Sequence, residues 1–198
     1  MQTGRMLRPG SYIFTAGYHL NIEHDDDGEE EVHGDFDLSA LSNGANFIVR
    51  RGILSFFDLG ANFSLGLSSI EPRFSVFAGE RFASAFGVKW LFPTFSFDTP
   101  ILYRYKLAWY SSYEFLPNLA VYAVPHVELK LMGREKAAYL GLSAGLVLGR
   151  ENGFIIEASH AYAVKGEDPR SYQQIIIGYT WGLDKLAGRF GAESAKEI

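Results

Sequence analysis

Apolar and polar residues alternate with a period of two over most of this chain, and this alternation constrains its fold more than any other feature. Between Asp58 and Leu67 every second residue is apolar, and the residues between them are small or polar. Successive side chains of a β-strand point to opposite faces, so this stretch predicts a strand with one apolar face. The longest apolar face is predicted for residues 119–132 and consists of Leu119, Val121, Ala123, Pro125, Val127, Leu129 and Leu131.

The same period recurs in ten segments, which we expect to be the strands of one antiparallel sheet. The segments are about 11–23, 34–50, 58–67, 71–78, 84–92, 101–112, 119–132, 137–149, 154–164 and 172–181. The phase slips near residues 42–46, which predicts a β-bulge there, and residues 51–57 are expected to form a connection. No amphipathic helix separates the segments, so an up-and-down sheet that closes into a barrel is predicted. Eight strands is the alternative if the second and fourth segments are not strands.

Composition and charge exclude several classes of protein. Hydrophobic residues make up 47% and charged residues only 21%, which excludes a disordered chain or a coiled coil. There are no cysteines, and no apolar run is long enough for a membrane-spanning helix, whereas a membrane-spanning strand needs only about 9 to 11 residues. The acidic run at 24–33 accounts for the net charge of −5, so the rest is nearly neutral and no nucleic-acid partner is expected.

The alternation alone does not say whether the apolar face lines the inside or the outside of the barrel. In a soluble ligand-binding barrel this face is the core, whereas in a membrane barrel it meets lipid. The length of the apolar faces and the small residues opposite them favour the membrane barrel. Aromatic residues near the ends of the segments also favour it: Tyr12, Phe14, Trp90, Phe92, Trp109, Tyr179 and Trp181.

In these features the sequence resembles the small bacterial outer-membrane β-barrel proteins. The resemblance is sharpest at residues 174–181, QIIIGYTW, which look like the C-terminal targeting strand of that family. It implies an all-β, closed, up-and-down antiparallel membrane barrel over residues 1–182, in the outer membrane of a Gram-negative bacterium. An even number of strands places both ends of the barrel domain on the periplasmic side. Residues 183–198 depart from the family pattern and are expected to form a short periplasmic tail or helix.

Two sets of residues follow from the assignment of faces. The residues expected to face lipid are Leu59, Ala61, Phe63, Leu65, Leu67, Trp90, Trp109 and Trp181. A mixed-charge network that fills the lumen is expected from Arg104, Lys106, His126, Glu128, Lys130 and Glu157.

His126 and Glu128 are also the candidate catalytic residues. They lie two positions apart and share the lumen face, where a carboxylate that orients a histidine would resemble a general-base arrangement. We favour the structural network over this alternative. Ser159 and His160 are adjacent, so they are expected on opposite faces and do not form a catalytic pair.

The acidic run contains the candidate ligands for a hard cation such as Ca²⁺. These are Asp25, Asp26, Asp27 and Glu29, whose carboxylates suit such an ion. Their spacing does not match a calcium-binding loop, so a solvated loop is the preferred interpretation and no metal or other cofactor is expected.

Four functions are compatible with these expectations. The favoured one is a structural or interaction barrel with a filled lumen, in contact with membrane lipid and with another outer-membrane or periplasmic protein. The alternatives are a narrow channel or carrier for a small or hydrophobic ligand, an outer-membrane hydrolase, and a soluble lipocalin-like barrel. Whether the protein is an enzyme stays open, with a non-enzymatic role favoured.

Overall fold

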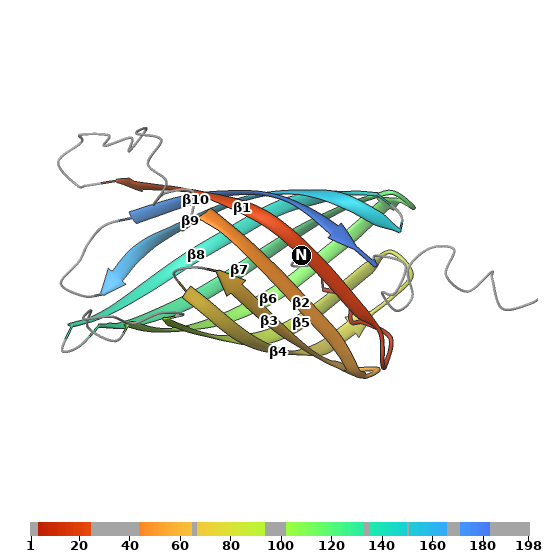
Figure 1. Cartoon of the computed structure of the whole chain (residues 1–198), viewed down its shortest axis with the longest axis horizontal. Helices are drawn as coiled ribbons and strands as arrows, with labels where there is room; N and C mark the ends of the chain where they lie inside the picture. Colours follow the sequence, from red (N-terminus) through yellow and green to blue (C-terminus); the bar gives the residue numbers. More distant parts are fainter. Residues whose placement is uncertain are drawn as a thin grey trace, which may run out of the picture.

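The strands of this protein form one closed barrel. The computed structural model describes residues 4–24, 44–64, 67–93, 102–132, 135–149, 151–165 and 171–182. Within these ranges the strands are β1 (Tyr12–His24), β2 (Ala45–Leu54), β3 (Phe57–Ser64), β4 (Leu67–Ala78), β5 (Phe82–Pro93), β6 (Leu102–Leu116), β7 (Leu119–Met132), β8 (Glu135–Leu148), β9 (Asn152–Lys165) and β10 (Ser171–Trp181). Each strand pairs antiparallel with the next in sequence, and β10 pairs with β1 to close the barrel (Figure 1). The predicted ten-strand, up-and-down barrel is therefore confirmed.

Two of the predicted boundaries are wrong. Residues 51–57 are not a connection, because β2 continues to Leu54 and β3 begins at Phe57, which leaves only a two-residue turn. Leu67 does not end the third strand either, since it begins β4 and pairs with Pro93 of β5. Among the described residues of β2 the pairing shifts between Gly52 and Leu54, whereas residues 42 and 43 of the predicted bulge lie outside the described part. Residues 34–41 of the second predicted strand also lie outside it.

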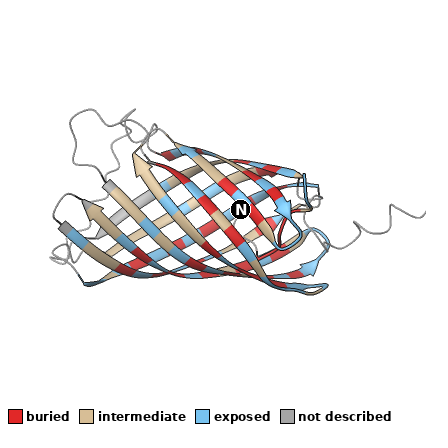
Figure 2. Ribbon diagram, turned by 90° about the horizontal axis from the view of Figure 1, so that it is seen from below, coloured by how far each residue is buried: buried red, intermediate tan, exposed pale blue. Residues whose placement is uncertain are grey.

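Burial alternates along the strands (Figure 2). The buried side chains point into the barrel, where those of different strands contact one another. In β7, for example, Tyr122, Val124, His126 and Glu128 are buried, whereas Val121, Pro125, Val127 and Leu129 are exposed on the outer wall. The outer wall is thus apolar, whereas the inside of the barrel contains the buried polar and charged side chains together with a small apolar cluster. No helix in the described ranges is long and apolar enough to cross a membrane.

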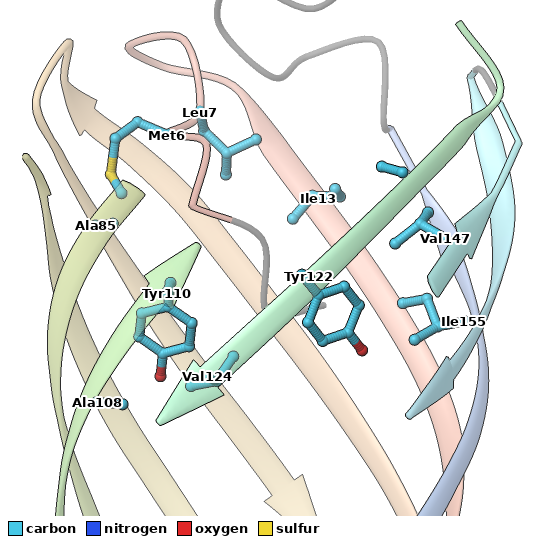
Figure 3. Packing of buried hydrophobic residues seen from close by; sticks show 11 residues of the cluster. Met6, Leu7, Ile13, Ala85, Ala108, Tyr110, Tyr122, Val124, Val147 and Ile155 are labelled. Atoms are coloured by element: carbon cyan, nitrogen blue, oxygen red, sulfur yellow. The ribbon is translucent and has the colours of Figure 1, made fainter. Parts of the chain in front are cut away.

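One end of the barrel has short turns between β2 and β3, β4 and β5, β6 and β7, and β8 and β9. We call it the turn end. The chain enters the barrel at this end before β1 begins, and we call residues Gly4–Leu7 the N-terminal plug. All four plug residues are buried, and Figure 3 shows Met6 and Leu7 inside the barrel with Ile13 and Ala85.

A glycine of the barrel wall makes room for the chain that follows the plug. A Cβ at Gly52 would lie 2.2 Å from the carbonyl oxygen of Arg8, so only glycine fits at this position of β2. The backbone N–H of Gly10 also donates to the carbonyl oxygen of Gly52 at 2.8 Å. These contacts fix the path of the chain from the plug into β1.

Candidate functional site

The lumen is the candidate site, because the polar side chains of several strands converge there. Asp58 of β3 and Arg73 of β4 are direct partners in the antiparallel pairing, and both point inward. Arg50 of β2 pairs with Gly60 of β3, which in turn pairs with Glu71 of β4. A Cβ at Gly60 would lie 2.9 Å from the guanidinium carbon of Arg50, so this glycine lets the Arg50 side chain lie across β3 toward β4.

These groups form a buried hydrogen-bonded cluster, the Asp58 cluster, of Arg50, Asp58, Glu71, Arg73 and Tyr110. Arg50 Nη1 donates to Asp58 Oδ1 at 2.7 Å, and Arg73 Nη2 donates to Asp58 Oδ2 at 2.8 Å. A second guanidinium nitrogen of Arg50 donates to Glu71, which also accepts from the hydroxyl of Tyr110. The cluster therefore ties β2, β3, β4 and β6 together across the inside of the barrel.

The charged side chains of this cluster are almost completely buried, so each of them needs an opposite charge nearby. Asp58 is 0% exposed and Arg73 is 1% exposed. A charge removed from water is costly unless a counter-charge and hydrogen bonds compensate it, and both carboxylates here receive several donors. The cluster is therefore a set of buried charges that are paired with one another on the inner wall of the barrel.

The N-terminal plug lies inside the barrel next to the Asp58 cluster. Arg5 is buried, and its side chain donates to the carbonyl oxygens of Gly79 at 3.1 Å and of Glu80 in the β4–β5 turn. Its Nε lies 3.2 Å from Glu114 Oε1 of β6. Arg73 Nη2 reaches the carbonyl oxygen of Arg5 at 3.4 Å, which links the plug to the Asp58 cluster.

The network expected from the sequence lies on the β6 to β10 side of the lumen. Arg104 Nη1 donates to Glu128 Oε1 at 3.3 Å, and the hydroxyl of Tyr172 donates to Glu128 Oε2 at 3.0 Å. Glu157 accepts from the hydroxyl of Tyr122 at 2.7 Å. In the strand pairing, Lys106 of β6 lies opposite Glu128 of β7 and Lys89 of β5, and Arg104 of β6 lies opposite Lys130 of β7.

The candidate catalytic residues His126 and Glu128 share the lumen face without a hydrogen bond between them. His126 Nδ1 lies 3.0 Å from the carbonyl oxygen of Val124, and its Nε2 has no hydrogen-bond partner among the described residues. Both Glu128 oxygens bind other residues, so this carboxylate does not orient the imidazole. Ser159 bonds to Ser143 at 2.9 Å inside the barrel, whereas His160 is exposed on the outer wall.

The residues expected to face lipid are found on the outer wall wherever the structure describes their side chains. Leu59 and Phe63 are exposed and Ala61 is half-buried. Trp90, Trp109 and Trp181 are exposed by 43%, 42% and 42%. Leu65 and the side chain of Leu67 lie outside the described part of the structure.

Aromatic rings gather on the outer wall at the turn end. Trp181 lies 4.9 Å from Tyr179, and Tyr179 lies 5.0 Å from Phe154, measured between ring centroids. Phe14 of β1 is the pairing partner of Trp181 and stacks on Phe47 of β2 at 6.1 Å. Neighbouring strands thus carry an aromatic band of the kind found at membrane interfaces.

The candidate metal ligands cannot be placed from the structure. Asp25, Asp26, Asp27 and Glu29 lie outside the described residues. Within the described ranges, no group of three or more His, Asp or Glu side chains could hold a metal ion.

Sequence reasoning missed the Asp58 cluster and Arg5 as functional candidates. Arg50 and Arg51 are adjacent, so the alternation did not show which of the two arginines points inward. The sequence of β4 could have indicated the cluster, because Glu71 and Arg73 lie two positions apart and therefore point to the same face of the strand.

Comparison with solved structures finds other barrels at very low sequence identity. The NanC porin matches with a TM-score of 0.52 and 7% identity, over 87% of this chain and 100% of that chain. The chain and the NanC porin share one fold. This confirms, at the level of the fold, the resemblance to small bacterial outer-membrane β-barrel proteins.

Two further structures match less closely. Neisserial surface protein A matches with a TM-score of 0.43 and 9% identity, over 88% of this chain and 99% of that chain. Ail, the attachment invasion locus protein of Yersinia pestis, here in complex with the heparin analogue sucrose octasulfate, has a TM-score of 0.40 and 14% identity with the same coverage. No protein-family model matches the sequence, and neither does any curated protein.

Proposed function

We propose that this protein is a bacterial outer-membrane β-barrel whose lumen is closed by its own side chains and whose role is structural or in binding a membrane or periplasmic partner. The apolar outer wall, the aromatic band at the turn end and the fold shared with a porin support the membrane location. In this orientation the turn end faces the periplasm, because short turns are typical of that side.

The proposal that the lumen is closed rests on one observation, the Asp58 cluster. It bridges β2, β3, β4 and β6 through buried hydrogen bonds, so no wide aqueous path passes between these strands. The N-terminal plug closes the same lumen at the turn end. A barrel of about this strand number has an interior that side chains can fill.

Ion conductance across a planar lipid bilayer tests this proposal. Heat-dependent gel mobility first confirms that the full chain is folded. After reconstitution into the bilayer, the full chain should give no conductance steps of the size of a porin channel. Steady porin-sized conductance by the full chain would overturn the closed lumen.

A narrow channel is the second candidate, and the plug favours it. The turn end is closed by a segment that precedes β1 rather than by the strands themselves. A chain without residues 1–8 distinguishes the two functions. This shortened chain gives no conductance steps if the Asp58 cluster alone closes the lumen. It gives conductance steps if the plug is the gate of a narrow channel.

A further inference from the structure

A small cavity lies in the lumen beside the Asp58 cluster. It has a volume of about 30 Å³. It is lined by Ile48, Arg50, Gly60, Asn62, Ser69, Glu71, Lys89, Lys106 and Tyr110. A cavity needs roughly 10 to 15 Å³ of this kind of volume for each water molecule, so the space suits two waters or one slightly larger ion.

Two lysines, Lys89 and Lys106, line this cavity beside one carboxylate, Glu71. Lys89 and Lys106 are direct pairing partners on β5 and β6, so two ammonium groups emerge side by side on the lumen face. No carboxylate of the described residues lies within 4 Å of either ammonium nitrogen, but Glu128, the pairing partner of Lys106 on β7, and Glu157 lie close enough to act on Lys106 electrostatically. Glu71, the carboxylate that lines the cavity, already accepts from Arg50 and Tyr110. Like charges placed directly opposite each other are destabilising unless something lies between them.

Uncharged polar groups in the cavity also lack partners. Ser69 is 2% exposed, and its hydroxyl has no hydrogen-bond partner among the described residues. The amide oxygen of Asn62, its pairing partner on β3, is buried without a hydrogen bond as well; it is an acceptor, so water or an ammonium group can satisfy it but an anion cannot. A buried hydroxyl without a partner costs free energy, and a hydroxyl can donate to an anion.

We propose that this cavity binds a small inorganic anion of halide size, held by the ammonium groups of Lys89 and Lys106 and by the hydroxyl of Ser69. Such an ion separates the two like charges and accepts hydrogen bonds from all three donors. The volume favours a small inorganic ion over a phosphate ester or a larger organic acid, because the space holds only about two water-sized spheres. Water alone would satisfy Ser69 but would leave no anion between the two ammonium groups.

The direct test uses bromide, which scatters X-rays anomalously. Crystals of the full chain grown in sodium bromide should show an anomalous peak between the Lys89 and Lys106 side chains. The peak should disappear in Lys89→Met and in Lys106→Met, and it should persist in Lys136→Met, which removes an exposed lysine from the outside of the barrel. A wild-type cavity without a peak would show that it holds water only and would overturn the proposal.

A solution measurement decides the matter if a lysine variant does not fold. The thermal midpoint of the wild type in detergent micelles should rise as chloride replaces gluconate at constant ionic strength. Lys89→Met should weaken the apparent chloride affinity by about tenfold or more, whereas Lys136→Met should not change it. A midpoint that does not respond to chloride would contradict the site. Neither result depends on conductance, so failure here leaves the proposed closed lumen standing.

Discussion

At the scale of single residues, Asp58 is the centre of the Asp58 cluster. It binds the guanidinium groups of Arg50 and Arg73, and these reach Glu71 and the plug residue Arg5 in turn. Exposed ion pairs contribute little to stability, but a buried pair is costly to break because the remaining charge stays out of water.

The substitution Asp58→Asn should therefore be strongly destabilising. The amide side chain would keep the shape of the carboxylate but leave two buried guanidinium groups short of a counter-charge. We expect a loss of about 3 to 5 kcal/mol in the free energy of unfolding. Equilibrium urea unfolding of the protein in lipid vesicles measures this loss.

The matched control is Glu151→Gln, which makes the same chemical change on an exposed turn residue. Its effect should stay within about 0.5 kcal/mol of the wild type. Equal stability of the two variants would mean that the Asp58 cluster does not support the barrel.

Individual residues also show what the sequence could and could not predict. Arg104 and Glu128 were assigned to one face from the alternation, and they bond to each other because their strands are neighbours in the barrel. The contact between Arg50 and Glu71 was not predictable in this way. It spans two strand pairings and depends on the space left at Gly60, which only the paired strands reveal.

At the scale of strands, the outer face of β8 offers the clearest test of the membrane assignment. From the turn end upward it carries Leu148, Leu146, Ala144, Leu142, Leu140, Ala138 and Lys136. Leu142 is in the middle of this face and 53% exposed, and Leu148 is at its turn end. In a membrane these two leucines lie at different depths.

The same substitution at the two depths should have different effects. Leu142→Arg should cost about 2 to 4 kcal/mol in the free energy of folding into vesicles, and Leu148→Arg about 0 to 1 kcal/mol. The difference arises because a charge is least tolerated near the bilayer midplane. Urea unfolding of both variants in vesicles measures it, and equal costs would argue against a lipid-facing wall.

Strand boundaries were harder to predict than strand faces. The β2–β3 turn consists of Ser55 and Phe56 and contains neither Gly nor Pro, so little in the sequence marks a turn there. Near Leu67 the alternation continues although one strand has ended and the next has begun. A side-chain period of two reports the face of a residue but not the strand to which it belongs.

At the scale of the whole molecule, the barrel combines an apolar outer wall with a lumen that contains its buried charges. Its inner wall holds the Asp58 cluster, the Arg104–Glu128 pair and the N-terminal plug. The proposed membrane location accounts for this distribution, because in water large exposed side chains such as Phe63 and Phe154 would contact solvent on nearly every strand.

The three tryptophans make the central claim directly measurable. The chain contains only Trp90, Trp109 and Trp181, and all three are exposed on the outer wall. Fluorescence of the protein reconstituted in vesicles of brominated phospholipid reports whether these side chains touch acyl chains. Vesicles of the same lipid without bromine are the control.

A membrane barrel predicts strong quenching by the brominated lipid and weak quenching by iodide added to the water. Unchanged fluorescence in brominated vesicles, together with strong quenching by iodide, would show that the apolar wall does not face lipid. That result would contradict the membrane barrel.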